Sequence, residues 1–461
     1  MALIEVAPAD AEAWALLGGG LLALGQAVGA VEAFTHALTH DETPDRQADL
    51  AVARWRAGDP EGAERSFARA LSADPRHRRA RLNRANLRIW RGDDGGGWVD
   101  ANAALQLAPG DPALLGARAA AALHLGRAGA ALADLDQALV GAPADPRLHW
   151  NRALALLTIG RLREGLALYG TRRMRAEGTG AALVPGVPLW RGEPLGGRRL
   201  LLLAEQGFGD KLQFVRFAED LAERGAEVIV RCHPRLVALL QRVRGVCSVV
   251  TRDDELPDVD RQISMMDVPG VLGVGAAQLH HRRYLSADAA RVSAWARRVD
   301  APGLVVGIGW QGNPAYRTDH LRSPPLKALR PVGAVPGVQL VCLQKEHGRD
   351  QIPGAAIPML DLAPELDEGA DAFADTAAVL ESLALVITSD TALAHLAGGM
   401  GRPTWLVLPH AADWRWMLDR RDSPWYPSMR LFRQPAPGAW APVFAEVARE
   451  LGRWAAGEEM S

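Results

Sequence analysis

The chain has little cysteine, no long apolar run and almost no net charge, and each shortage excludes a class of protein. Its three cysteines, Cys232, Cys247 and Cys342, lack CxxC or metal-ligand spacing and are too few for a disulfide framework. No apolar run approaches the roughly 20 residues that a membrane span needs. The 52 basic and 54 acidic residues nearly cancel, which argues against a nucleic-acid or membrane-surface partner.

The start of the chain also lacks the basic region of a signal peptide, because its first charged residues are Glu5 and Asp10. Together with the scarce cysteines, this predicts a cytoplasmic protein without a transmembrane segment. Length and apolar content are what the chain does have. Its 461 residues, 48% of them hydrophobic, are enough for about three domains with cores of their own.

A repeat of 33 or 34 residues occupies the first part of the chain. Small residues recur at this step in two columns, and prolines that close successive segments keep the same step. This pattern is typical of tetratricopeptide repeats, in which small residues let two antiparallel helices approach closely. The sequence predicts an α-solenoid of about five repeats over residues 1–177, whose concave face suits a peptide or protein partner. The columns are Ala30, Ala63, Gly97, Ala131 and Gly165, then Ala37, Ala70, Ala104 and Ala138, and the prolines are Pro75, Pro109 and Pro143.

The third repeat is degenerate and carries three arginines where packing residues are usual. Arg81, Arg84 and Arg88 share one helical face because they are spaced three and four residues apart. They indicate either a solvated face or a contact for an acidic partner, and we favour the solvated face.

Residues 178–197 are rich in glycine and proline and are predicted to be a linker. Beyond them, apolar runs alternate with helical patterns, as in parallel α/β sheets. The fold class is therefore α followed by α/β: a solenoid, then two Rossmann-like halves at 198–300 and 301–461, the second ending in a helix at 441–454. The predicted strands are residues 198–204, 227–232, 246–251 and 261–265 in the first half, and 303–310, 338–343, 383–388 and 404–408 in the second.

Ligands of such sheets bind outside the carboxyl ends of the strands. Four loops are predicted to form a cleft there, residues 205–210, 311–322, 344–345 and 389–391. The last loop, Ser-Asp-Thr, supplies N-cap residues for a following helix whose free N–H groups and positive dipole end suit a phosphate. A well-capped crossover helix without a ligand is the alternative interpretation.

The first of these loops contains Gly207, Gly209 and Asp210. It lacks the third glycine of a dinucleotide fingerprint because Leu212 occupies that position, which weakens an oxidoreductase interpretation. Asp210 stands at a helix start facing the cleft, so it is a candidate general base, but simple N-capping is the alternative that the sequence alone favours. The other candidates for the acceptor side of the cleft are Glu205, Gln206, Gly207 and Gly209.

Four segments together carry a resemblance to a known family. They are LWRGEPLGGRRLLLLAEQGFGDKLQFVRF (189–217), GWQGNPAYRTDHLRS (309–323), ITSDTALAHLAGGMGRPTWLVLP (387–409) and DWRWMLDRRDSPWYPSMRLFRQ (413–434). The chain resembles bacterial glycosyltransferases of the heptosyltransferase-like family with the GT-B fold, as they occur fused to tetratricopeptide repeats. It is similar in this respect to protein O-linked N-acetylglucosamine transferases and flagellin-modifying transferases.

The resemblance implies an inverting, metal-independent glycosyltransferase that needs no cofactor besides its nucleotide-sugar substrate. It also implies that the final helix, at residues 441–454, crosses back onto the first half. Asp210 would take the proton of the acceptor hydroxyl as it attacks the anomeric carbon. The family's lysine in the loop at residues 315–322 is replaced here by arginines and His320, so the identity of the donor stays open. For His395, a packing role is the alternative. The implied donor-binding residues are Ser389, Asp390, Thr391 and His395, with Arg317, Arg322, Gln344 and Lys345.

Aromatic residues cluster close to the carboxyl end of the chain. They either stack on a base or sugar or anchor a seam between domains, and we favour the seam. The cluster consists of Trp414, Trp416, Trp425 and Tyr426.

For the whole chain, the leading expectation is transfer of a sugar to a hydroxyl of a protein recruited by the repeats, such as a serine or threonine of a flagellin-like surface protein. A lipopolysaccharide or lipid-linked sugar acceptor is the enzymatic alternative. A scaffold that binds nucleotide sugar without turnover is the alternative from another class. No nucleic-acid partner is expected.

Overall fold

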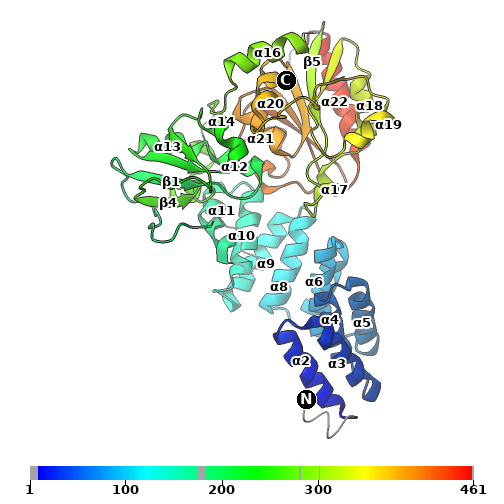
Figure 1. Cartoon of the computed structure of the whole chain (residues 1–461). Helices are drawn as coiled ribbons and strands as arrows, with labels where there is room; N and C mark the ends of the chain where they lie inside the picture. Colours follow the sequence, from blue (N-terminus) through cyan, green and yellow to red (C-terminus); the bar gives the residue numbers. More distant parts are fainter. Residues whose placement is uncertain (1–8, 175–181, 280–281, 301, 459–461) are drawn as a thin grey trace. The chain divides into compact units, whose positions relative to one another are not determined.

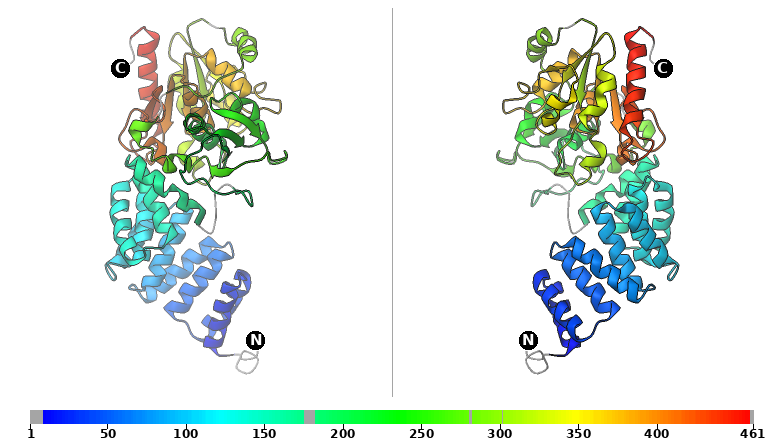
Figure 2. Two further views of the ribbon diagram at one scale, coloured as in Figure 1. Left: turned by 90° about the vertical axis from the view of Figure 1, so that its left-hand side faces the viewer. Right: turned by 90° about the vertical axis from the view of Figure 1, so that its right-hand side faces the viewer.

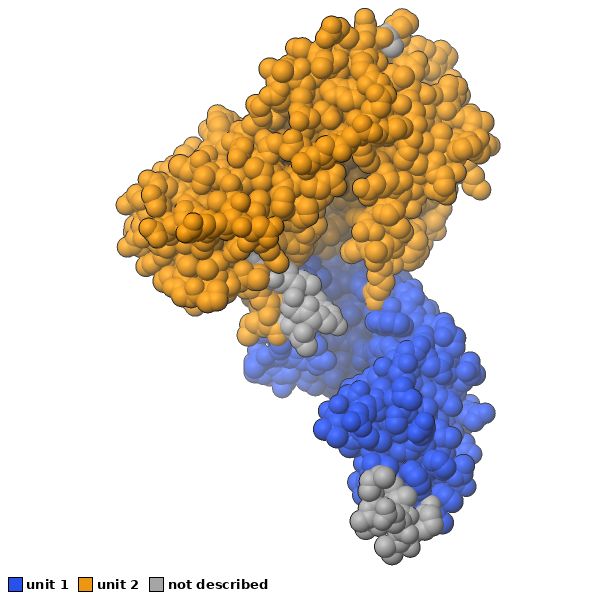
Figure 3. Space-filling view, viewed as in Figure 1, with its two compact units in different colours: residues 1–155 blue, residues 156–461 orange. Residues whose placement is uncertain are grey.

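A computed structural model of the chain describes residues 9–174, 182–279, 282–300 and 302–458. It contains two compact units, Met1–Ala155 and Leu156–Ser461, drawn in blue and orange in Figure 3. We call the first unit the repeat arm.

The repeat arm is a stack of helix pairs (Figures 1 and 2). The turn inside each pair has a glycine in the left-handed region, Gly25, Gly58, Gly92 and Gly126, with φ of 77°, 85°, 88° and 73°. The small residues of both columns are buried, Ala30 completely, so the helices approach closely. First helices of successive pairs also contact one another, which confirms a tetratricopeptide-like solenoid. The helices are α2 (Ala11–Ala23), α3 (Ala27–His40), α4 (Pro44–Arg56), α5 (Pro60–Ala73), α6 (Arg78–Arg91), α7 (Asp94–Leu105), α8 (Pro112–His124) and α9 (Ala128–Gly141).

The arginines of the third repeat do not form a solvated face. Arg84 donates two hydrogen bonds of 2.7 Å to Asp100, a carboxylate that is only 1% exposed. Arg88 and Arg81 contact the same carboxylate at 2.9 and 3.4 Å. A buried charge is stable only when it is paired and hydrogen-bonded, so these arginines satisfy a charge inside the solenoid, and our preferred interpretation was wrong. The corresponding pair in the next repeat is Arg118 and Asp134.

The fifth repeat crosses the boundary between the units. Its first helix, α10 (Pro146–Thr158), spans the boundary, whereas α11 (Leu162–Leu168) and the 3-10 turn η1 (Tyr169–Met174) lie in the second unit. There α11 packs on α15 (Val268–Val271) so closely that a Cβ atom on Gly270 would lie 2.4 Å from the Leu166 carbonyl oxygen. The sequence placed the end of the repeat domain at residue 177, but in the structure its last helix belongs to the second unit.

The second unit contains two all-parallel sheets, with strand orders β3-β2-β1-β4 and β10-β9-β8-β5-β6-β7. Each sheet starts at an inner strand, runs outward on one side and then returns to the other, which is the doubly wound order. The predicted strands are all present, which confirms the parallel sheets. β7 has only two residues, and the arginines of β10 interrupt its apolar pattern, so both were missed. The strands are β1 (Arg199–Leu203), β2 (Glu227–Arg231), β3 (Val246–Val250), β4 (Arg261–Ser264), β5 (Leu304–Gly309), β6 (Val338–Cys342), β7 (Leu360–Asp361), β8 (Leu385–Ser389), β9 (Thr404–Leu408) and β10 (Met429–Arg433).

The last helix, α22 (Trp440–Ala455), packs on the second sheet. We expected it to cross back onto the first half, and it does not. Its buried Phe444, Val447 and Leu451 share one core with Ile308 and Trp405. Figure 2 shows this helix in red along the strands of its own half. The spacing of its apolar residues gives it one broad apolar face, and the sheet of its own half covers that face.

The seam between the two halves is formed by α12 (Phe208–Phe214), which packs against α21 (Ala392–Gly399), and by aromatic side chains. Phe214 lies 6.0 Å from Trp425, measured between ring centroids, and Arg216 donates a 2.9 Å hydrogen bond to the Trp425 carbonyl. This confirms the predicted seam. The helical segment after β1 is divided into α12 and α13 (Phe217–Glu223). The remaining helices are α14 (Val237–Leu240), α16 (Ala289–Val299), α17 (Asp319–Arg322), α18 (Arg330–Gly333), α19 (Ile352–Ala355) and α20 (Ala374–Glu381).

Within the described ranges, every helix is too short or too polar to cross a lipid bilayer.

Candidate functional site

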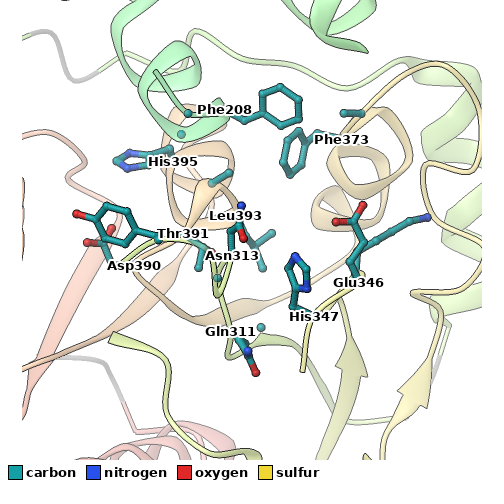
Figure 4. Close-up of a pocket in the computed structure, with 18 of the residues that line it drawn as sticks. Phe208, Gln311, Asn313, Glu346, His347, Phe373, Asp390, Thr391, Leu393 and His395 are labelled. Carbon is teal, nitrogen blue, oxygen red and sulfur yellow. The ribbon is translucent and has the colours of Figure 1, made fainter. Parts of the chain in front are cut away.

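A cavity of about 690 Å³ lies between the two halves of the second unit, at the carboxyl ends of their strands (Figure 4). All four predicted loops contribute to its lining. The loop after β9, the segment at residues 367–376 and Arg235 also contribute, and the predicted cleft did not include them. The cavity therefore occupies the position where doubly wound sheets bind ligands.

Strained backbone concentrates around this cavity. Four of its lining residues, Gln206, Glu346, Asp367 and Phe373, are not glycine but have φ of 59°, 58°, 51° and 65°. Each such residue costs of order 1 kcal/mol or more, and it persists only where the surrounding structure holds it. This concentration is typical of a functional site.

Asp210 faces the cavity and also caps the helix that carries it. Its Oδ2 atom accepts a 2.9 Å hydrogen bond from the Gly207 N–H, so the capping interpretation is correct as far as it goes. Its Oδ1 atom accepts a 2.6 Å hydrogen bond from Arg415. Burial raises the pKa of Asp210 above its usual value, although the positive charge of Arg415 opposes this shift. The carboxylate thus has a second partner that a simple cap does not need.

Arg415 is the main site residue that the sequence analysis missed. It is 6% exposed and donates hydrogen bonds to Gln213 at 2.6 Å and to Asp413 at 2.9 Å. Its guanidinium carbon lies 4.4 Å from the centre of the Trp414 ring. The signal was available, because Arg415 follows the predicted strand at 404–408 and parallel strands end at the same edge of a sheet.

The start of α21 forms one wall of the cavity. Thr391 is the N-cap residue, and within the described part of the chain its side chain makes no capping hydrogen bond. Ala392 and Leu393 line the cavity, and the first N–H groups of a helix have no partner within the helix. Ser389, in contrast, is the completely buried last residue of β8 and lies outside the lining, which corrects its expected role in donor binding.

Asp390 is a buried carboxyl in the same wall. It is 7% exposed, and burial together with the negative charge of Asp413 raises its pKa from the usual 3.8 to about 6, while Arg322 opposes the shift. A carboxyl group that ionises near neutral pH inside a cavity is typical of a functional site.

His395 lines the cavity and also packs in the seam, so the packing interpretation is confirmed and donor binding stays a prediction. It is 5% exposed, its Nδ1 atom lies 2.9 Å from the Tyr426 hydroxyl, and it stacks on Trp416. Burial lowers its pKa well below the usual 6.5, so the imidazole is neutral at neutral pH. A Cβ atom on Gly209 would lie 2.8 Å from its ring, which shows how closely α12 and α21 approach.

Two of the three predicted cations reach the cavity. Arg322 and Lys345 line it, and Arg322 pairs with Asp319 at 3.0 Å and lies 4.7 Å from the Tyr316 ring centre. Arg317 is exposed and lies outside the lining, so the structure does not support it as a clamp. Its sequence position close to Arg322 gave no way to tell the two apart.

Gln344 is a structural residue rather than a free donor ligand. Its Oε1 atom accepts hydrogen bonds from the backbone N–H groups of Trp310 and Gln311 at 2.8 and 2.9 Å. Its Nε2 atom donates to the carbonyl groups of Gln311 and His347, both at 2.9 Å. The side chain lines the cavity, but these bonds use it to hold the loops after β5 and β6 together.

Glu205 also departs from its predicted place on the acceptor side of the cleft. It is 4% exposed, pairs with Arg172 and accepts a 2.6 Å hydrogen bond from the Ser264 hydroxyl. The three other candidates of this loop do line the cavity. They are Gln206, Gly207 and Gly209.

Two aromatic rings from opposite halves meet at the cavity. Phe208, at the start of α12, and Phe373, just before α20, have ring centroids 5.9 Å apart and planes 81° apart (Figure 4). Neither was predicted, because nothing in the sequence pairs two phenylalanines that are so far apart along the chain. Both rings belong to the apolar part of the cavity lining.

Comparison with known proteins leaves the family open, since no protein-family model matches the chain. The chain is 31% identical over 302 residues to Protein FlbA of Caulobacter vibrioides, an alignment that covers 59% of this chain and 49% of that protein. The chain thus spans about half the length of the curated relative that it matches.

Similar solved structures match a third to a half of the chain. One is a tetratricopeptide repeat protein from Parabacteroides merdae (20% identity, TM-score 0.32, covering 36% of this chain and 66% of that one). A second is TTC0263, a thermophilic TPR protein in Thermus thermophilus (23% identity, TM-score 0.32, covering 36% of this chain and 92% of that one). A third is pilF of Pseudomonas aeruginosa (19% identity, TM-score 0.35, covering 47% of this chain and 86% of that one).

Proposed function

We propose that the second unit is an inverting glycosyltransferase that moves a sugar from a nucleotide-sugar donor to an acceptor hydroxyl. One observation carries the proposal: the carboxylate of Asp210, from one parallel-sheet half, and the open N-terminus of α21, from the other, line a single cavity. The two elements touch, since a Cβ atom on Gly209 would lie 3.5 Å from the Ala392 Cα atom. A base and an anion site are thereby held next to each other.

In the proposed reaction the acceptor oxygen attacks the anomeric carbon while Asp210 takes its proton. The bond between this carbon and the diphosphate oxygen breaks, and the leaving nucleoside diphosphate keeps the electron pair. The N–H groups at the start of α21 with Arg322 and Lys345 would stabilise the charge of this leaving group. Burial raises the pKa of Asp210, which makes it a stronger base than an ordinary carboxylate. Metal-independence stays a prediction.

We propose a protein as the acceptor, recruited by the repeat arm, because stacked helical repeats present extended surfaces on which polypeptides bind. A hydroxyl of a serine or threonine in a flagellin-like surface protein remains the expected target. A lipopolysaccharide or lipid-linked sugar acceptor and a non-catalytic scaffold are the competing outcomes of the test.

The test combines donor turnover with acceptor mass. Full-length Asp210→Ala protein serves as bait for acceptor proteins, which are then incubated with the wild-type chain and a panel of nucleotide sugars, and their intact masses are recorded. Transfer predicts a mass gain of one sugar residue with release of the nucleoside diphosphate. The matched control is Asp288→Ala, because Asp288 also caps a helix of this unit but lies outside the cavity. Transfer that persists in Asp210→Ala would reduce Asp210 to a cap, and an unchanged mass with tight nucleotide-sugar binding would favour the scaffold.

A further inference from the structure

A buried ion-pair network lies at the end of the fifth repeat, outside the cavity. Arg172, in η1, is completely buried. Its Nη1 atom donates to the Tyr169 carbonyl at 3.0 Å and to Asp267 at 2.5 Å, and its Nη2 atom donates to Ser264 at 3.2 Å and pairs with Glu205. A charge without solvent is costly unless it is matched in this way, so the network fixes η1 against the ends of β1 and β4.

The first route from this turn to the cavity runs through Glu205. Glu205 begins the loop that leads from β1 to Asp210, and the Ser264 hydroxyl donates a further 2.6 Å hydrogen bond to it. The next residue, Gln206, has a left-handed backbone, and its carbonyl accepts a 2.7 Å hydrogen bond from Lys211. Since the loop is short and held at both ends, the position of Glu205 determines where Asp210 points.

The second route runs through aromatic rings. Tyr169 is 3% exposed and its ring centroid lies 5.6 Å from that of Trp414. Trp414 in turn supports the guanidinium of Arg415, which donates the 2.6 Å hydrogen bond to Asp210. Arg172 also lies 5.0 Å from the centre of the Tyr169 ring, so the two routes start from one rigid turn.

We propose that Tyr169 and Arg172, on the turn that ends the repeat array, are positioning residues that hold Asp210 from both sides. This inference rests on the proposed function, in which Asp210 is the base. It assigns the last helical segment of the repeat array to the catalytic machinery. A deletion of residues 1–175 would remove these two residues together with the repeats, so loss of transfer in that deletion would not show where the acceptor binds.

The alternative is that Tyr169 merely fills space, and the ionisation of Asp210 separates the two cases. The charged groups that face Asp210 are Arg415, Asp413 and Lys211, and the Gly207 N–H also bonds to it. If Tyr169 is shortened, Trp414 loses its support and Arg415 moves away from the carboxylate. The pKa of Asp210 should then rise, because the positive charge that opposes the effect of burial is weaker. A packing defect in the preceding helix α11 should not change the pKa of Asp210.

The experiment measures this ionisation without relying on transfer. The full chain is labelled with 5-fluorotryptophan, the Trp414 resonance is assigned with Trp414→Phe, and its 19F shift is followed as a function of pH. In Tyr169→Leu we expect the titration midpoint to move to higher pH by about one unit. The control is Leu166→Ala, which truncates an equally buried side chain of the preceding helix α11 and should leave the midpoint unchanged. An unmoved midpoint in Tyr169→Leu, or an equal shift in the control, overturns the proposal.

Two further variants keep the test decisive. Tyr169→Phe retains the ring against Trp414 and should move the midpoint less than Tyr169→Leu does. If Tyr169→Leu does not fold, Gly270→Ala disturbs the network instead, because Gly270 lies in the short helix whose N-cap residue is Asp267, and it should move the midpoint in the same direction. Where donor turnover is measurable, kcat of Tyr169→Leu should fall by about 10-fold or more with the donor KM nearly unchanged, because misplacement affects the base and not donor binding. A wild-type chain without turnover would refute the proposed function but leave the titration readable.

Discussion

The repeat arm and the cavity of the second unit both bury carboxylates, but they treat them in opposite ways. Asp100 of the arm receives hydrogen bonds from three arginines, so its charge is matched within a regular helical array. In the cavity, burial raises the pKa of Asp210 and Asp390, and neighbouring residues have strained backbones. A matched buried charge of the first kind serves stability, whereas a buried carboxylate with a raised pKa lowers stability at neutral pH and is typical of a functional site.

The largest effect should come from Asp210→Asn, which keeps the size of the side chain but cannot accept the acceptor proton. We expect kcat for sugar transfer to fall about 1,000-fold, as for the loss of a general base, with little change in nucleotide affinity. Steady-state turnover and calorimetric titration with the nucleoside diphosphate measure the two quantities. The far-UV circular dichroism melting curve should stay close to that of the wild type. A loss below about threefold would remove Asp210 from the chemistry.

In the repeat arm, Asp100→Ala should lower stability and leave turnover unchanged, which is the reverse of the result expected for Asp210→Asn. Removal of this carboxylate leaves three arginines without their shared partner, so we expect the arm to lose about 2 to 4 kcal/mol of unfolding free energy. The arginines retain some solvent contact, which moderates the cost. Urea unfolding followed by circular dichroism measures the loss, and donor turnover per folded molecule should be unchanged. Equal stability of variant and wild type would mean that the buried pairs contribute nothing net.

Asp390 tests the other side of the comparison, the stability cost of a mismatched carboxylate. Its folded-state pKa of about 6 lies above the usual 3.8, so between these values the folded protein holds a proton that the unfolded chain has lost. Stability contributed by this group therefore falls as pH rises through that window. Asp390→Asn does not ionise, so it should be more stable than the wild type by about 1 to 3 kcal/mol at neutral pH.

The stability of Asp390→Asn is measured by urea unfolding at two pH values. The gain in unfolding free energy should be present at about pH 7.5 and absent at about pH 4. Asp260→Asn is a suitable control because Asp260 is an exposed carboxylate of the same unit away from the cavity. A gain of equal size at both pH values would show that the amide simply packs better, and would contradict the ionisation argument.

Much of this architecture follows from the sequence, because the repeat step and the uniformly apolar strands each reflect one repeated physical requirement. The edge of the sheets that holds the cavity follows too, since parallel strands end together. Side-chain direction does not follow. Glu205 and Asp210 are carboxylates of one loop, yet one points to Arg172 in the interior and the other to the cavity.

Most of the remaining differences between the predicted and the observed site come from pairing between residues that are distant in the sequence. Gln344 and Arg322 look like equivalent cleft residues in the sequence, but the backbone groups of two loops occupy the amide of Gln344. The role of Arg415 depends on Asp210, 205 residues earlier in the chain. Hydrophobic periodicity carries no information about such pairs, so the cavity could be located from the sequence but its hydrogen-bond network could not.

The smallest effect should come from the strained backbone at Gln206. Its side chain is exposed and its φ of 59° disfavours any residue with a Cβ atom, so Gln206→Gly should raise the unfolding free energy by about 0.5 to 1 kcal/mol. Gln241→Gly is the matched control, because Gln241 has a helical backbone with φ of −60°. This variant should lower the unfolding free energy by about the same amount. If both variants lose stability, the fold holds Gln206 without strain, and only the titrating carboxylates would distinguish the cavity from the arm.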